Sequence, residues 1–296
     1  MTDERSQRIG HFLLGVAVLT WGANFGIVKA AFQDMPPVLF GALRFTVSGF
    51  LVLLITFWKE KGILIRREDG PRLIAAGAIG LGFYQVFWSI GLNITSATNS
   101  ALILSLQPLL ATLYVDLMHQ EPVPRRQYGG MLLGLGGVSL VILKPSAQLH
   151  FSLSTLSGDL LTLLAAASSA IFLTVWSKPL LKRYSPLRLT GYNMATGAIV
   201  LWITAAVFPQ TISWDQVSGR TWWSLGYAVL FSGIAGHVFW YEGLDRIGVT
   251  KSMVYVYFIS MWAILFNYFL MGEKIFLQQI LGGALILWGV HRVLRS

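Results

Sequence analysis

Polar and aromatic side chains recur at helical spacing inside long apolar runs of this sequence. Trp21 and Asn24 are three residues apart, so they share one face of a helix. Tyr84 and Trp88 are four apart and do the same. Polar groups are costly inside an apolar run, and aromatic rings beside them can hold a small amphipathic ligand. The candidate ligand-binding residues are Trp21, Asn24, Tyr84, Trp88, Ser100, Gln107, Trp176, His237, Tyr241 and Tyr257.

Each of these residues also has a purely structural interpretation. Asn24 can form a hydrogen bond between helices instead of contacting a ligand. The aromatic rings can fill a core or anchor the chain at a membrane interface. Tyr257 is preferred to Tyr255 as a candidate. The interfacial role is favoured for the tryptophans near the ends of apolar runs, which are Trp58, Trp222, Trp223 and Trp288.

Catalytic and metal-binding motifs do not occur in the sequence. It has no cysteine, which excludes disulfides, thiol catalysis and cysteine-ligated metals. No two of the five histidines stand four residues apart, and no His-Glu-x-x-His, Gly-x-Ser-x-Gly or P-loop motif is present. We therefore expect no enzyme activity, no cofactor, no metal and no hydrolysis of ATP by this chain.

Ten apolar segments dominate the chain. Its 296 residues are 55% hydrophobic and only 12% charged, which is about half the charged fraction of a soluble domain. A membrane-spanning helix needs about 20 mostly apolar residues. The sequence therefore predicts an all-α membrane protein with ten transmembrane helices, and Pro108 is expected to kink the fourth. The predicted spans are 11–32, 38–58, 72–91, 97–117, 127–143, 157–177, 188–208, 222–243, 250–271 and 276–293.

The basic residues orient these spans. Most of the 22 Lys and Arg residues fall in the connections on the side of the N-terminus, which predicts that both termini are cytoplasmic. The net charge of +9 then reflects orientation and attraction to anionic lipids, and no nucleic-acid partner is expected. Lys29 and Arg44 are expected to extend to the lipid headgroups, as is Lys251 at a span end.

An internal repeat organises the ten spans. Phe87-Trp88 and Phe239-Trp240 are 152 residues apart, and the same offset relates Glu121 to Glu273, Gln127 to Gln279, Gly130 to Gly282 and Gly137 to Gly289. Five spans per repeat place the second copy upside down relative to the first. The predicted domains are residues 1–150 and 151–296. Inverted repeats around a central cavity are typical of secondary transporters, and the alternatives are a channel or a duplicated structural bundle.

Several motifs resemble the EamA family of the drug/metabolite transporter superfamily. The segment Thr20-Trp21-Gly22-Ala23-Asn24-Phe25 is similar to its first-helix signature, and Gln107-Pro108-Leu109-Leu110 and Gly272-Glu273 are similar to its later helix endings. The second repeat departs from this pattern because Gly158–Trp176 contains Ser168 and Ser169 instead of the signature. The resemblance implies a bacterial inner-membrane exporter of small metabolites, in particular amino acids including aromatic ones.

Energy coupling and oligomeric state follow less directly from the residues. The acidic residues lie near predicted span ends, and His237 is the one mid-span titratable group. Facilitated diffusion is therefore favoured over proton antiport. A sugar-phosphate or drug carrier of the same superfamily is the alternative. The expected partners are a small-molecule substrate and membrane lipid. Gly130-x-x-x-Gly134 fits packing within the bundle better than a homodimer interface, which leaves the chain a monomer or a dimer.

Overall fold

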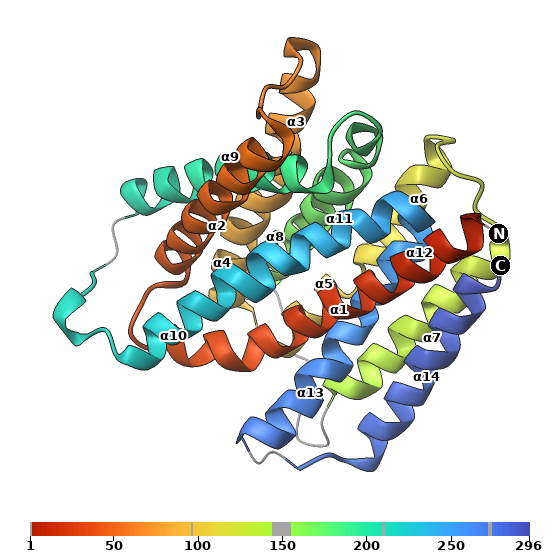
Figure 1. Ribbon diagram of the computed structural model, residues 1–296. Coiled ribbons are helices and arrows are strands. Elements are labelled where there is room, and N and C mark those ends of the chain that lie inside the picture. The colour runs from red at the N-terminus through yellow and green to blue at the C-terminus, as the bar shows by residue number, and fades with distance from the viewer. Residues whose placement is uncertain (1, 96, 144–154, 209–210, 272–273) are drawn as a thin grey trace.

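The computed structural model is a bundle of helices, shown in Figure 1. It describes residues 2–95, 97–143, 155–208, 211–271 and 274–296, and in these ranges there is no strand. The helices are α1 (Thr2–Ala31), α2 (Pro37–Glu60), η1 (Arg67–Asp69), α3 (Gly70–Gly77), η2 (Ala78–Phe83), α4 (Tyr84–Ile94), α5 (Ala97–Leu104), α6 (Gln107–Leu117), α7 (Arg125–Ile142), α8 (Leu156–Ala167), η3 (Ser168–Val175), η4 (Lys178–Lys182), α9 (Pro186–Val207), η5 (Trp214–Gln216), α10 (Gly219–Tyr227), η6 (Ala228–Ala235), α11 (Gly236–Ile247), α12 (Val249–Met253), η7 (Val254–Val256), α13 (Tyr257–Met271) and α14 (Leu277–Leu294).

Among the described residues, seven helical segments are long and apolar enough to cross a membrane: Glu4–Val28, Pro37–Glu60, Arg67–Ile94, Asn99–Leu117, Leu156–Lys182, Pro186–Val207 and Val249–Phe269. The predicted spans 127–143 and 276–293 coincide with α7 and α14. Neither helix is among the seven. Each has only 18 residues, so the polar residues at its ends lower the mean hydropathy of the whole helix. The predicted span 222–243 lies in the helical segment formed by α10, η6 and α11.

At Pro108, where the sequence predicted a kink, the structure has a break between two helices. α5 ends at Leu104 and α6 begins at Gln107 with Pro108 in its first turn, where a missing backbone N–H costs nothing.

Three other helical segments, η2, η3 and η6, contain π-helical turns, which are common at functional sites.

Helix bounds recur at the offset of 152 residues. α7 and α14 start at Arg125 and Leu277, and α4 and α11 start at Tyr84 and Gly236, each directly after a π-helical segment. The predicted domain boundary at residue 150 lies outside the described residues, as do Gly272 and Glu273.

α7 and α14 lie side by side and antiparallel, in contact through glycines (Figure 1). A Cβ on Gly137 would lie 2.6 Å from the Gly282 carbonyl oxygen, and a Cβ on Gly289 would lie 2.5 Å from that of Gly130. Gly130 and Gly134 therefore face the interior of the bundle, as the packing interpretation expected. The other main helix pairs are α2 with α9, α1 with α11, and α4 with α8.

Candidate functional site

An aromatic cluster joins α1, α2 and α11. We use this name for Trp21, Phe45, His237 and Trp240. The Trp21 ring centroid lies 5.3 Å from that of His237 and 5.2 Å from that of Trp240, and Phe45 meets His237 edge-on at 6.2 Å. Gly236 permits this approach, because a Cβ there would lie 2.6 Å from Trp21 Nε1. Two of the predicted residues, Trp21 and His237, are thus in direct contact.

Backbone carbonyls of η6 hold the polar atoms of this cluster. Trp21 Nε1 donates to the Ser232 carbonyl oxygen at 3.0 Å. His237 Nδ1 lies 3.2 Å and 3.0 Å from the carbonyl oxygens of Ser232 and Gly233. Carbonyl oxygens only accept hydrogen bonds, so Nδ1 carries a proton and donates to them.

Arg44 lies next to the aromatic cluster. The sequence predicted that its side chain extends to the lipid headgroups, but it turns toward η6 instead. Its Nε donates to the Ala228 carbonyl oxygen at 3.1 Å and its Nη2 to Ser232 Oγ at 2.7 Å. Its guanidinium carbon lies 4.7 Å from the Phe45 ring centroid. The side chain folds inward because η6 offers it acceptors at this depth. The side chain of Lys29 lies outside the described part of the chain.

Two other predicted residues carry buried polar atoms without a hydrogen-bond partner. These atoms are Asn24 Oδ1 and Ser100 Oγ. A buried acceptor without a partner costs roughly 1–3 kcal/mol, and a ligand that donates a hydrogen bond can recover that cost. Asn24 lies one turn beyond Trp21 on the same face of α1.

A cavity of about 440 Å³ opens at another part of the molecule, between α3, α6 and the end of η3. Its lining includes Arg72, Tyr114 and Trp176. Trp176 Nε1 donates to the Tyr114 hydroxyl at 3.0 Å, and Arg72 Nε donates to the Trp176 carbonyl oxygen at 2.9 Å. Trp176 is the residue of the predicted set that lines this cavity.

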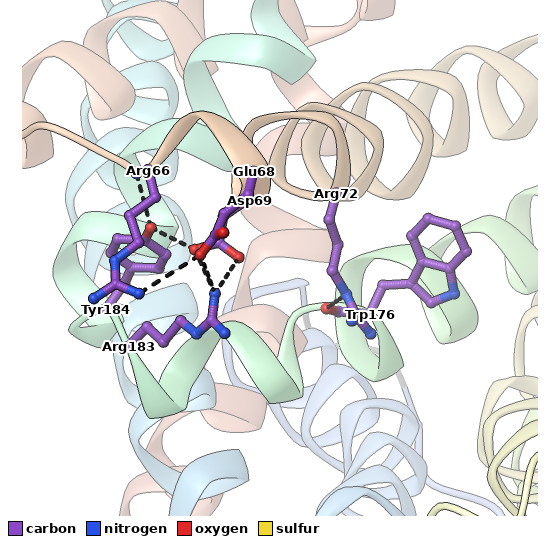
Figure 2. A network of polar contacts seen from close by, with 7 residues as sticks. All are labelled: Arg66, Glu68, Asp69, Arg72, Trp176, Arg183 and Tyr184. Atoms are coloured by element: carbon purple, nitrogen blue, oxygen red, sulfur yellow. Dashed lines mark hydrogen bonds and ion pairs between the residues drawn. The ribbon is translucent and has the colours of Figure 1, made fainter.

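A polar network borders this cavity, and Figure 2 shows it beside Arg72 and Trp176. The Asp69 carboxylate accepts from Arg183 Nη1 at 3.0 Å and from the Tyr184 hydroxyl at 2.7 Å. Arg183 also contacts Glu68 at 3.0 Å. These bonds tie the start of α3 to the segment between η4 and α9.

Tyr241 and Tyr257 contact protein groups through their hydroxyls. The Tyr241 hydroxyl donates to the Leu173 carbonyl oxygen at 3.0 Å and accepts from Asn193 Nδ2 at 2.7 Å. The Tyr257 hydroxyl donates to the Met131 carbonyl oxygen at 3.1 Å, and its ring lies against Gly134. Both side chains are fully buried, and their hydroxyls are hydrogen-bonded to protein groups.

The remaining predicted residues are half-buried. Tyr84, at the start of α4, is near enough to Arg44 to interact with it electrostatically. Trp88 and Gln107 are partly exposed on α4 and at the start of α6.

Sequence reasoning missed Arg44, Arg72 and Tyr114. A signal for Arg44 was present: with Gly41 and Ser48 it forms a small and polar stripe on α2, at three- and four-residue spacing, which indicates a face turned toward other helices. Arg72 and Tyr114 stand at span ends, and only the fold brings them to Trp176.

The arrangement can bind a small ligand. Within the described ranges, no group of three His, Asp or Glu side chains could hold a metal ion. Aromatic faces, one guanidinium, one imidazole and unpartnered polar atoms are suited to recognising a small amphipathic molecule.

Comparison with known proteins follows the same division into halves. The sequence profile described as the EamA-like transporter family matches residues 8–143 and again residues 156–295. The two matches cover nearly the whole chain, one for each half.

Individual relatives align along the full chain. Uncharacterized transporter YyaM of Bacillus subtilis is 27% identical over 281 residues, covering 94% of this chain and 90% of the relative. An uncharacterized transporter of Archaeoglobus fulgidus is 25% identical, covering 96% and 98%. A crystal structure with 20% identity superposes with a TM-score of 0.83 over 98% of this chain and 97% of the other, which supports the fold.

Proposed function

The chain belongs to the EamA-like transporter family and is a multi-pass membrane transporter, and from this premise we propose that it exports small metabolites by alternating access. The proposed substrates are amino acids, including aromatic ones. The aromatic cluster with Arg44 and the unpartnered Asn24 carries this proposal, because it combines apolar faces with a few polar groups inside the bundle.

We propose that ten membrane-spanning helices form two inverted five-helix repeats. The contacts between α7 and α14 support this. Gly130 meets Gly289 and Gly137 meets Gly282, so each pair is the image of the other under the offset of 152. Two antiparallel helices that make the same contacts on each other are related by a two-fold axis. If this axis lies in the membrane plane, one repeat is inverted relative to the other. The two matches of the family profile point the same way.

One-sided access is supported by a second pair of equivalent positions. Ser224 lies 152 residues after Arg72. Arg72 donates to the Trp176 carbonyl beside the cavity, and Ser224 Oγ donates to the Ile27 carbonyl at 3.0 Å. The short Ser224 side chain lets α10 and α1 lie close together, whereas the long Arg72 side chain keeps α3 away from Trp176. We infer that the substrate enters at the Trp176 end. We further infer that the two halves exchange these close and open arrangements, which opens the site to the other side of the membrane.

For orientation we propose that both termini are cytoplasmic, in the inner membrane. In the view of Figure 1 the two ends of the chain lie together at one end of the molecule. The connection between α2 and η1, at that proposed cytoplasmic side, carries Lys61 and Arg66, as the distribution of basic residues requires.

For energy coupling we propose facilitated diffusion. The contacts of the aromatic cluster and Arg44 among the described residues include no carboxylate. The Nδ1 proton of His237 is already bound by the carbonyl oxygens of Ser232 and Gly233. A relay through this group would have to break those bonds.

The deciding experiment is flux into liposomes that contain the purified protein, using a panel of radiolabelled amino acids with and without a pH gradient. We expect saturable flux of aromatic amino acids that is equal in both conditions. Flux that needs the gradient would contradict facilitated diffusion, and loss of that dependence in His237→Gln would assign the proton to His237. Flux that never saturates would indicate a channel, and no flux of any amino acid would refute the substrate.

A further inference from the structure

We infer that Arg44 is the recognition group for a carboxylate, so that the transported molecule is a monoanionic carboxylate or a zwitterion with a free carboxyl group. This inference rests on the proposed function and specifies the chemistry of its substrate.

The charge of Arg44 has no counter-charge in its present contacts. The guanidinium lies along α2 within a segment long and apolar enough to cross a membrane. Its hydrogen bonds go to a carbonyl and a hydroxyl, and no ion pair among the described residues includes it. A cation at such depth is costly unless it is paired, and unpaired cations there mark ligand pathways.

The geometry leaves donors for a ligand. A guanidinium has five N–H groups in a planar fork, and the contacts with Ala228 and Ser232 use two of them. Arg44 is half-buried, and neither of these contacts uses Nη1. Two parallel N–H groups match the two oxygens of a carboxylate, and such bidentate pairs are the strong ones among charged hydrogen bonds.

Ser232 places this fork next to the aromatic cluster. Its hydroxyl accepts from Arg44 Nη2, while its carbonyl accepts from Trp21 Nε1. Because Arg44, Trp21 and His237 all contact Ser232, a carboxylate bound to Arg44 would lie next to the rings of Trp21 and His237. This is the arrangement that an amino acid with an aromatic side chain requires: an anion at one end and a large apolar group beside it.

A carboxylate fits better than a phosphate. A phosphate monoester carries a charge of about −1.5 to −2 and is usually held by several cationic groups. The groups that interact electrostatically with Arg44 are Tyr84, Tyr227 and His237, with no second Arg or Lys among the described residues. One guanidinium balances one carboxylate.

The test compares an acid with its amide, which differ only in the carboxyl group, and with a phosphate monoester. The purified protein is titrated with L-phenylalanine, L-phenylalaninamide and glucose 6-phosphate, and binding is read from ligand-dependent shifts in thermal unfolding. We expect wild type to bind the acid about 10- to 100-fold more tightly than the amide, because a hydrogen-bonded charge is lost in the amide. Arg44→Gln should abolish this preference, and Arg44→Lys should reduce it because an ammonium has no fork.

Two controls separate recognition from structure. Ser232→Ala keeps the charge of Arg44 but removes a hydrogen bond that positions its fork, so it should weaken the preference for the acid less than Arg44→Gln does. Arg8→Gln removes an exposed arginine paired with Glu4 and should leave the preference unchanged.

Each outcome decides the inference. An acid preference that persists in Arg44→Gln overturns it, as does tighter binding of glucose 6-phosphate than of the acid by wild type. If Arg44→Gln does not fold, an undiminished preference in Arg44→Lys overturns it. Arg44-dependent binding of phenylalanine without any amino-acid flux in liposomes would support Arg44 and refute the proposed transport function.

Discussion

At the scale of single residues, several buried side-chain donors of this chain form hydrogen bonds to backbone carbonyl oxygens. Trp21, His237 and Tyr241 all do so, and their acceptors lie in the π-helical segments η3 and η6. A π-helical turn leaves carbonyls without their ordinary α-helical partner, so side chains from neighbouring helices can reach them. Asn24 Oδ1 and Ser100 Oγ are among the buried polar atoms without such a partner, and these are the two that we assign to a ligand.

Tyr241 provides a test of this satisfaction by carbonyls. In Tyr241→Phe the Leu173 carbonyl loses its donor and Asn193 Nδ2 loses its acceptor at 2.7 Å. Because both groups remain buried, we expect a loss of about 1–3 kcal/mol in the free energy of unfolding. Thermal or denaturant unfolding of the purified protein measures it. Tyr268→Phe, where the side chain is 47% exposed, is the control and should be neutral; equal effects of the two substitutions would contradict the assignment.

Asp34, between α1 and α2, gives a pH-dependent prediction. Hydrogen bonds from the Ser218 and Thr221 side chains and from the Ser218 backbone N–H hold the pKa of the Asp34 carboxyl below its ordinary value. A lowered pKa means that the carboxylate stabilises the fold above the ordinary pKa, and that this contribution disappears as pH falls through the lower value of the folded state.

Asp34→Asn should therefore lower the melting temperature at pH 7, and the difference from wild type should shrink as pH falls below about 4. Melting curves recorded between pH 7 and pH 3 give the melting temperatures of wild type and Asp34→Asn at each pH. A difference that stays constant over this range would mean that the charge of Asp34 does not stabilise the link to α10.

At the scale of elements, glycines decide which helices can touch. On α7, Gly137 faces the α14 backbone, whereas a Cβ on the adjacent Gly136 would meet nothing within 4 Å. Close backbone approach lets van der Waals contact hold helices together where no hydrophobic force acts between them in lipid. The same device recurs between α2 and α9, where a Cβ on Gly49 would lie 3.1 Å from the Ala195 backbone nitrogen.

The neighbouring glycines of α7 form a matched pair of substitutions. Gly137→Ala puts a Cβ 2.6 Å from the Gly282 carbonyl oxygen, so the helices must move apart, and we expect a loss of about 1–3 kcal/mol. Gly136→Ala should be neutral or stabilise by up to about 1 kcal/mol, because alanine favours the helix. Unfolding of the two variants in the same detergent compares them. The reverse order would show that α7 and α14 do not pack through this face.

At the scale of the whole molecule, an inverted repeat predicts which connections face which side. The connection after α2 contains Leu64, which is 85% exposed, and the connection before α10 contains Asp215, which is also exposed. With the proposed orientation, these connections lie on opposite sides of the membrane. The absence of native cysteines makes single-cysteine variants clean reporters.

Leu64→Cys and Asp215→Cys should therefore differ in labelling by a membrane-impermeant maleimide. In sealed right-side-out vesicles we expect Asp215→Cys to react and Leu64→Cys to react only after the vesicles are opened. Cysteine-free wild type measures the background. Reaction of both variants from one side would refute the inverted arrangement, and an exchanged pattern would reverse the orientation.

Composition, periodicity and repetition determined the class of this protein before any contact was known. Apolar runs of helical length leave no alternative to membrane-spanning helices, since backbone polar groups must be satisfied within each segment in lipid. The break at Pro108 and the family resemblance also came from local sequence, because proline acts on its own helix and the motifs are contiguous. These features depend on neighbours along the chain, and the structure and the family profile confirm them.

The contacts between distant segments were decided only by the tertiary structure. Arg44 looked like a cation that extends to the headgroups because its acceptors, Ala228 and Ser232, are more than 180 residues away along the chain. The candidate tyrosines shared a helix face with other polar residues, yet the packing of η3 and α7 supplied carbonyl acceptors for Tyr241 and Tyr257. A helix face is set by local spacing, but what that face meets depends on how all the helices pack together.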